Sequence, residues 1–346
     1  MYYKLSILLL FLSTLHIQSQ TKFETKYDSI ALSYNIKAWR LYEIQNDSAL
    51  FYANKGIEYS ITNNSTIGHI LNLEIKGIYY EEVKNDFQTA SELYFEAIEI
   101  AEQNNPELMT SLYNNLCIMY MVTDYEKSEF YGKKAVETSV YDKSSDKHKE
   151  KSALVNLGIA QSLLKKYKEA KTTFDRYLAF TDESEYHKNI VNLRIAKNYK
   201  EQGLYEKAQP LFLKIVALDS LKGQREYAQD YLQLVENSIQ LKDVQTIQKY
   251  IPFLEKSNSK ERNIEVKRGF NEIMTKVYTF LNKPEKAIEY QTKLIQIKDS
   301  INSKLYKKSV IELETKYQTK KKEEQIEQEQ YQRKLWSNIS IVAFVI

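Results

Sequence analysis

The chain has 346 residues, with 49 basic and 46 acidic side chains, a formal net charge of +3, and 43% hydrophobic residues. This composition excludes an intrinsically disordered chain, and the lack of a long block of one charge argues against a nucleic-acid-binding surface. There are 8 glycines and 4 prolines, where average usage would supply about 40. Because sandwiches, barrels and doubly wound sheets need many tight turns, the composition favours an all-α fold.

Residues 1–20 have the pattern of a secretory signal peptide. Lys4 supplies a positive charge, and residues 5–15 form an apolar stretch that is too short for a comfortable transmembrane helix. A polar mature chain would then begin at Thr21. The alternative is that this segment is a first helix buried in the fold.

A small or apolar residue recurs along the chain at intervals of 41, 38, 42, 38, 39 and 40 residues. Each lies early in the second helix of a predicted pair, where a bulky side chain would push the two helices apart. Self-similarity at this period is typical of a solenoid of stacked units. The pattern predicts about seven helix pairs over residues 25–300. The recurrent residues are Ala49, Ala90, Ser128, Ala170, Ala208, Ile247 and Ala287.

The clearest unit is residues 153–180. Its first helix carries Gly158, and its second carries Ala170 and Phe174 on one face, at helical spacing. The link at residues 165–167 is short, which makes the two helices antiparallel. The small residues lie where the helices cross, and Phe174 fills the space toward the next unit. The matching positions elsewhere are Gly77, Ala90, Cys117, Ser128, Ala196, Ala208, Phe212 and Ala287.

This arrangement resembles the tetratricopeptide repeat, a 34-residue helix–turn–helix unit with small residues at the helix crossing and aromatic residues at fixed offsets. The resemblance covers residues 25–300. It is strongest in the third to fifth units and weaker in the first unit and around Ile247. The period here is longer than the family standard, so longer helices or links are expected. The resemblance implies a right-handed superhelix whose first helices line a concave groove for peptides or partner helices.

Counting from the small residues identifies the positions of the first helices that, by this resemblance, would face the groove. Asn114, Lys197 and Lys200 are suited to hold a carboxylate or the backbone of an extended peptide, because amides and ammonium groups donate hydrogen bonds. The alternative is an ordinary solvated helix face. The candidate groove residues are Asn114, Ile118, Val155, Ile159, Leu193, Lys197 and Lys200.

No catalytic, cofactor or metal site emerges from the sequence. The 4 histidines are scattered, and no glycine-rich phosphate-binding loop is present. Cys117 is the only cysteine, which excludes a disulfide within the chain and a cysteine-based metal cluster. Its place at a helix crossing is better explained by packing than by reactivity. We therefore expect a chain without cofactor that is not an enzyme.

Residues 301–334 predict a long charged helix, because they contain no glycine or proline and are dense in Lys, Glu and Gln. A heptad seam begins at Val310 but breaks at Lys320. A solvated helix stabilised by charge pairs and a coiled coil joining two copies of the chain are both compatible with this pattern.

Residues 335–346 are apolar, and Trp336 is placed as an interfacial anchor would be. The stretch is shorter than the roughly 20 residues that span a bilayer. It is either a hydrophobic tail or the start of a transmembrane helix that the sequence cuts short, and we favour the second reading. Arg333 and Lys334 would then flank the outer side of the membrane, against the positive-inside preference.

Together these features resemble the sensory half of bacterial membrane-bound tetratricopeptide signalling proteins, in which a histidine kinase or helix-turn-helix output follows the span. The resemblance implies a non-catalytic protein- or peptide-binding module. It would be exported and anchored in the inner membrane with its repeats in the periplasm, and it would signal through residues 301–334. The alternatives are a freestanding extracytoplasmic scaffold and a truncated sensor histidine kinase that lacks its kinase domain. No nucleic-acid partner is expected in this portion.

Overall fold

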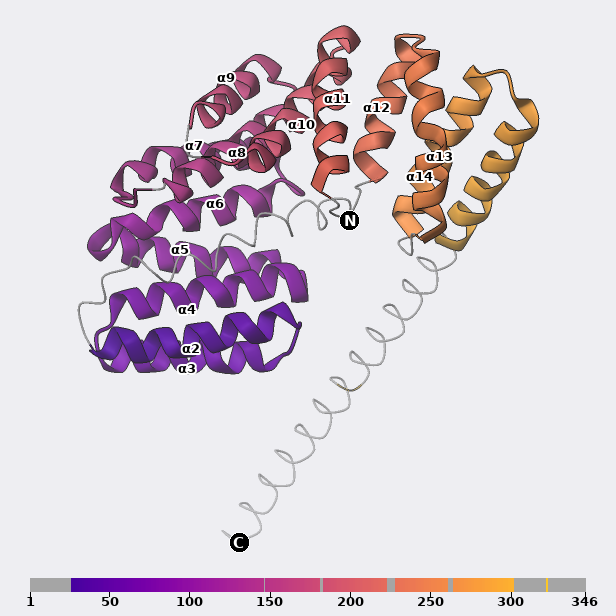
Figure 1. The fold of residues 1–346 in the computed structure, drawn as a ribbon. Coiled ribbons are helices and arrows are strands. Elements are labelled where there is room, and N and C mark those ends of the chain that lie inside the picture. Colours follow the sequence, from indigo (N-terminus) through magenta and orange to yellow (C-terminus); the bar gives the residue numbers. More distant parts are fainter. Residues whose placement is uncertain are drawn as a thin grey trace, which may run out of the picture. The chain divides into compact units, whose positions relative to one another are not determined.

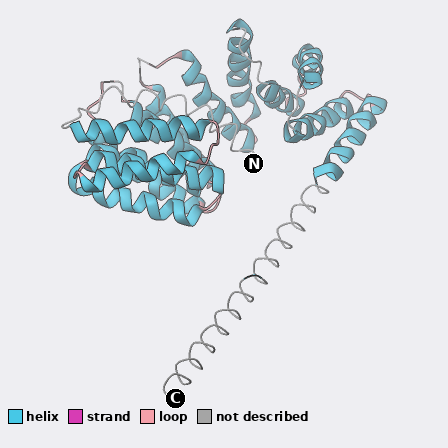
Figure 2. Cartoon of the chain, turned by 90° about the horizontal axis from the view of Figure 1, so that it is seen from below, coloured by secondary structure: helices cyan, strands magenta, loops and turns pink. Residues whose placement is uncertain are grey.

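The structure is a computed structural model that describes residues 26–145, 147–180, 183–222, 228–260 and 264–301, together with Lys322. All regular secondary structure in these residues is helical (Figure 2). The chain divides into two compact units, Met1–Arg225 and Glu226–Ile346.

Ten α-helices in the described part of the first unit form five consecutive hairpins (Figure 1). The second helix of a hairpin also packs against the first helix of the next, and first helices contact each other directly, as α2 contacts α4 and α6 contacts α8. The hairpins are α2 (Lys26–Glu43) with α3 (Ser48–Thr62), α4 (Thr66–Tyr79) with α5 (Phe87–Asn104), α6 (Met109–Tyr120) with α7 (Tyr125–Thr138), α8 (His148–Leu163) with α9 (Tyr167–Leu178), and α10 (Glu185–Glu201) with α11 (Tyr205–Lys222).

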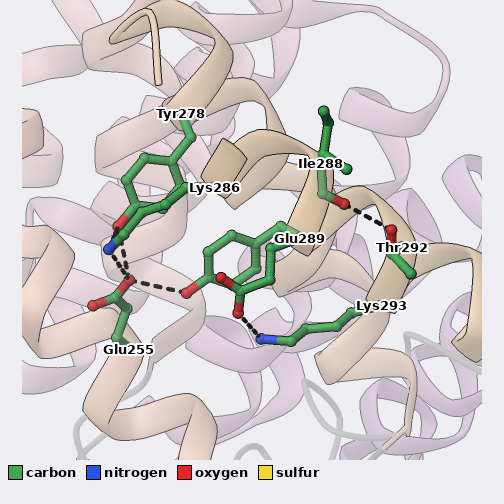
Figure 3. Close-up of polar contacts among 8 residues, drawn as sticks. Glu255, Tyr278, Lys286, Ile288, Glu289, Thr292 and Lys293 are labelled. Atoms are coloured by element: carbon green, nitrogen blue, oxygen red, sulfur yellow. Dashed lines mark hydrogen bonds and ion pairs between the residues drawn. The ribbon is translucent and has the colours of Figure 1, made fainter. Parts of the chain in front are cut away.

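The second unit contains two further hairpins among its described residues. They are α12 (Ala228–Gln240) with α13 (Val244–Lys260), and α14 (Ile264–Phe280) with the helix at residues 284–301. Glu255 of α13 ties these elements together, because its Oε1 accepts hydrogen bonds from the Tyr278 hydroxyl at 2.7 Å and from the Tyr290 hydroxyl at 2.9 Å (Figure 3). Lys286 Nζ lies 3.7 Å from the same oxygen.

The seven recurrent residues all lie in the first part of second helices and are buried. Two first helices approach their partners through glycine. A Cβ added at Gly158 would lie 2.4 Å from the Phe174 ring, and one added at Gly77 would lie 2.6 Å from the Tyr94 ring. These distances leave no room for a side chain, so the aromatic rings pack directly on the backbone of the facing helix.

The core of the first unit runs from one hairpin into the next. One hydrophobic cluster joins α4, α5 and α6 around Tyr94 and Leu112, and another joins α6, α8, α9 and α10 around Phe174 and Leu154. Because no hairpin buries its apolar face alone, stacking of neighbours is what stabilises each of them.

Cys117 is fully buried between α6 and α7. Burial raises the pKa of its thiol to about 12, although a hydrogen bond with the Ser128 side chain opposes the shift. Ser128 Oγ also donates to the Cys117 carbonyl oxygen at 2.8 Å. Since the thiolate is the reactive form, this cysteine is a packing residue.

A left-handed residue ends the first helix of most hairpins. Gly203 follows α10 with φ 73°, and the next amide, that of Leu204, donates to the Tyr199 carbonyl oxygen at 2.9 Å. This is the hydrogen-bond pattern of a Schellman cap. Glycine is not required for it, because other residues adopt positive φ at the corresponding turns. These are Gln45, Asn85, Lys165, Lys242 and Asn282.

The hairpin of α4 and α5 departs from the others. The segment between α4 and α5, residues 80–86, is longer than residues 121–124 between α6 and α7, because α4 continues into a π-helical turn, Tyr80–Lys84, that ends at Asn85 with φ 55°. A π turn is the usual way for a helix to accept an extra residue. It sets the directions of Glu81 and Glu82, which the turn carries.

No helix in the described part of the chain is long and apolar enough to cross a membrane. The predicted signal peptide (1–20), the charged helix (301–334) and the apolar end (335–346) lie outside the described residues, apart from Ile301 and Lys322.

Candidate peptide-binding surface

A line of polar contacts joins the first helices of successive hairpins in the first unit. Each contact links two side chains 36 to 42 residues apart, which is about one repeat. The hydrogen bonds run from Asn115 Nδ2 to Glu74 Oε1 at 3.0 Å, from Asn156 Nδ2 to Asn114 Oδ1 at 2.9 Å, and from Asn198 Nδ2 to Ser162 Oγ at 2.9 Å. We call these six residues the polar seam.

Three of the seven candidate groove residues belong to the interior. Val155 and Ile159 are buried in the cluster that surrounds Phe174. Asn114 is also buried, and its side chain bonds to Asn156 and, at 3.4 Å, to Ser152. The neighbouring first helix covers these positions, so they support the surface and do not themselves face a ligand.

The other four candidates, Ile118, Leu193, Lys197 and Lys200, are partly exposed. The last three lie on α10 at i, i+4 and i+7, which places them on one face of that helix. This face combines an apolar side chain with two ammonium groups, a combination that suits a carboxylate with an adjoining apolar group.

Two acidic side chains on the surface of the first helices were not among the predicted groove residues. Asn114 lies three residues before Cys117, and Lys200 lies four residues after Ala196. The same offsets, counted from Gly77, lead to Glu74 and Glu81. Glu81 Oε2 accepts a hydrogen bond from the Tyr94 hydroxyl at 3.0 Å.

The carboxyl groups of Glu74 and Glu81 have raised pKa values. Burial is the main cause at Glu81, where the neighbouring Glu82 adds to it and the Tyr94 hydroxyl opposes it, and the pKa of Glu81 is raised to about 8. Burial also raises the pKa of Glu74, against the effects of Lys149 and Asn115. At neutral pH the Glu81 carboxyl is therefore mostly protonated.

A second tyrosine, from another helix, bonds to the same π turn. The Tyr42 hydroxyl of α2 donates to Glu82 Oε2 at 2.6 Å, and burial together with Glu82 raises the pKa of Tyr42. Tyrosine hydroxyls from α2 and α5 thus hold the two adjacent carboxyl groups of the π turn in place.

The first unit is electrostatically uneven. Residues 26–107 contain 13 Asp and Glu side chains but only 6 Lys and Arg side chains. On α10, Lys188, Arg194, Lys197 and Lys200 outnumber Glu185 and Glu201. Residues 26–107 are therefore acidic as a whole, whereas α10 is basic.

The described helices define an α-solenoid of stacked hairpins. No protein-family model and no curated protein matches the sequence. Among solved structures, a tetratricopeptide repeat protein from Parabacteroides merdae is 14% identical, with a TM-score of 0.52, over 77% of this chain and 93% of that one.

Two further solved structures are similar in the same way. The pilF protein of Pseudomonas aeruginosa is 18% identical, with a TM-score of 0.52, over 68% of this chain and 96% of that one. The apo form of the quorum sensor NprR from B. thuringiensis is 13% identical, with a TM-score of 0.51, over 85% of this chain and 94% of that one. The chain therefore has the tetratricopeptide-repeat fold, which confirms the resemblance of its repeats.

Proposed function

We propose that this chain is a non-catalytic module that binds protein or peptide segments along the first helices α4, α6, α8 and α10. The polar seam is the observation that carries the proposal. Each amide side chain has two N–H donors and an acceptor oxygen, so one bond to a neighbour leaves capacity for another partner. Glu74, Asn115 and Ser162 of the seam are partly exposed, and an extended peptide offers backbone donors and acceptors to such groups.

The uneven charge favours one orientation of a bound segment. A basic end would lie near the π turn that follows α4, within the acidic residues 26–107, and an acidic end or C-terminal carboxylate would lie near Lys197 and Lys200 of α10. Charge complementarity of this kind selects partners and register more than it adds affinity.

Synthetic peptides test this proposal. Dye-labelled extended peptides with one lysine-rich end and one glutamate-rich end are titrated with the full chain, and binding is followed by fluorescence anisotropy. Replacing both α10 lysines (Lys197→Glu with Lys200→Glu) should weaken binding about tenfold, because two attractive charges become repulsive. The matched control replaces the exposed Lys165 and Lys168, on the link and on α9, by Glu. Equal losses in the two double variants would contradict the proposal.

The finer part of the proposal is that this module is the sensor portion of a membrane-anchored signal-transduction protein. The signal-like residues 1–20, the charged residues 301–334 and the apolar residues 335–346 support it. The similarity in fold to a protein described as a quorum sensor is compatible with it. In this reading the repeats lie outside the cytoplasm, and residues 301–334 transmit the binding of a ligand to the repeats within a homodimer.

Reporter fusions test the finer part separately. Alkaline phosphatase, which is active only after export, is fused after residue 300 in a bacterial host. An active fusion that becomes inactive when residues 1–20 are removed is the expected result. An inactive fusion with intact residues 1–20 would contradict the export and membrane reading and leave the peptide-binding proposal standing.

A further inference from the structure

A group of aromatic side chains on α5, α6 and α7 lies apart from the polar seam. Tyr131 is at its centre, with its ring centroid 6.1 Å from that of Phe95, 5.1 Å from that of Phe130 and 5.5 Å from that of Tyr120. Tyr113 stacks on the same ring, with centroids 6.3 Å apart. We call these five residues the aromatic patch.

Two members of the aromatic patch are open to solvent. Phe95 is 42% exposed and Phe130 is 54% exposed. Exposed phenylalanines that touch one partly buried ring form continuous apolar area, unlike single apolar side chains scattered over a surface. Such area commonly marks a protein contact, because aromatic side chains give the largest gain when a partner covers them.

The border of the patch on α5 is acidic. Glu92 and Glu99 lie three residues before and four after Phe95, on the same helix face, and Glu96 is adjacent. Helix α5 contains no lysine or arginine. Among the described residues, Glu96 forms an ion pair only with His69. Burial lowers the pKa of His69, so no permanent cation neutralises this face.

The border on α7 differs because its lysines already have acidic partners. Lys133 lies 2.9 Å from Glu129, and Lys134 lies 3.7 Å from Glu137. The uncompensated charge next to the aromatic patch is therefore the negative charge of α5.

An exposed phenylalanine elsewhere in the first unit shows what is missing at the patch. Phe51 of α3 is 53% exposed, and Lys55 Nζ lies 4.7 Å from the centroid of its ring. Within the described residues, no lysine or arginine is placed in this way over Phe95 or Phe130. Within the patch, Lys127 Nζ lies 5.2 Å from the centroid of the Tyr120 ring, so the chain's own cation covers that ring but not the exposed Phe95 and Phe130.

We propose that the aromatic patch and its acidic border on α5 form a second docking surface, which binds a basic amphipathic segment of a protein partner. The apolar side chains of that segment cover Phe95 and Phe130, and its lysines or arginines meet Glu92, Glu96 and Glu99. A cation over an aromatic ring adds a further favourable contact. Charge complementarity distinguishes this occupant from an acidic or wholly apolar partner.

A designed helical peptide tests the proposal. It carries leucine and phenylalanine on one face and lysine on the other, and the comparison peptide has glutamate in place of every lysine. The full chain is titrated with each dye-labelled peptide. The lysine peptide should bind, and its affinity should fall when salt rises, because screening weakens the contact with the exposed glutamates. The glutamate peptide should not bind.

Matched variants locate the contact. Phe95→Ser with Glu99→Gln changes the patch, and Phe51→Ser with Glu58→Gln makes the same replacements on α3, where both side chains are exposed. The first pair should weaken binding of the lysine peptide about tenfold, and the second pair should change it less than about twofold. Circular dichroism checks that both variants keep the helical fold.

Two outcomes would overturn the proposal. Equal binding by the two double variants would show that the peptide senses only the overall acidity of the first unit. Sedimentation showing a dimer that Phe95→Ser dissociates would mean that a second copy of the chain covers the patch instead.

Discussion

The ends of α4 and α10 occupy equivalent places in their repeats but offer opposite chemistry. Glu81 lies four residues after Gly77, and Lys200 lies four residues after Ala196. Glu81 carries a desolvated carboxyl that a tyrosine hydroxyl holds, whereas Lys200 is a partly exposed ammonium group. Packing residues therefore define the scaffold, while the residues at fixed offsets from them can differ in charge from one repeat to the next.

The end of α4 also differs from the end of α10 in its backbone. The π turn at Tyr80–Lys84 follows α4, whereas α10 ends in an ordinary cap at Gly203. The Tyr94 ring passes over Gly77, and its hydroxyl reaches Glu81. Packing at the helix crossing and the electrostatics of the acidic end are thus coupled through one tyrosine.

The largest expected effect comes from breaking that coupling. In Gly77→Ala, the new methyl group would meet the Tyr94 ring, so we expect a loss of about 2 kcal/mol or more in the free energy of unfolding. The matched control is Gly269→Ala in α14, where nothing lies within 4 Å of the added Cβ and the helix should gain about 0.5–1 kcal/mol. Urea denaturation measures both. Losses of equal size would contradict the packing argument.

The next effect concerns the pH dependence of the acidic end. The pKa of Glu81 is about 8 in the fold and near 4.5 without it. A raised pKa stabilises the fold fully below pH 4.5, and that contribution is lost as pH rises through about 8. Stability should therefore fall between pH 6 and pH 9, by about 2 kcal/mol once partial exposure is taken into account.

Glu81→Gln isolates this contribution. The variant keeps a neutral side chain that can hydrogen-bond to Tyr94, so its stability should fall less over the same interval. Urea midpoints at pH 6 and pH 9 provide the comparison. Parallel falls in the wild type and the variant would show that another group is responsible.

The smallest effect concerns the hairpin links. Lys165 adopts φ 60° in the link between α8 and α9, a conformation that glycine reaches without strain. Lys165→Gly should raise the free energy of unfolding by about 0.5–1 kcal/mol, and Gly203→Ala should lower it by about the same amount. Thermal denaturation measures both changes as shifts of the melting temperature. If both substitutions shift it in the same direction, backbone strain does not control these turns.

Much of the scaffold was predictable because its determinants are local and periodic. The small residues at 38- to 42-residue intervals identified the hairpins, and each of them is buried at the start of a second helix. The π turn after α4 was not predictable, since an extra residue in a helix looks in the sequence like a longer link. The left-handed conformation of Lys165 was equally hidden, because lysine has no marked preference for it.

The surface was predictable only in part, because periodicity indicates which residues share a helix face but not how deeply each side chain is buried. Val155 and Ile159 share the register of Leu193 and Lys197, yet they are buried. The raised pKa of Glu81 depends on burial, with Glu82 adding to it and the Tyr94 hydroxyl opposing it, and has no sequence signal. Glu74 and Glu81 themselves could have been found by applying the same offsets to Gly77.

The central claim is that the first helices α4 to α10 bind an extended segment in one direction. The most direct test is photocross-linking of the full chain to peptides that carry a benzophenone at either the basic or the acidic end, followed by mass spectrometry. We expect the basic end to cross-link to α4 and its π turn and the acidic end to α10. Cross-links on second helices such as α9, or the same sites for both ends, would contradict the claim.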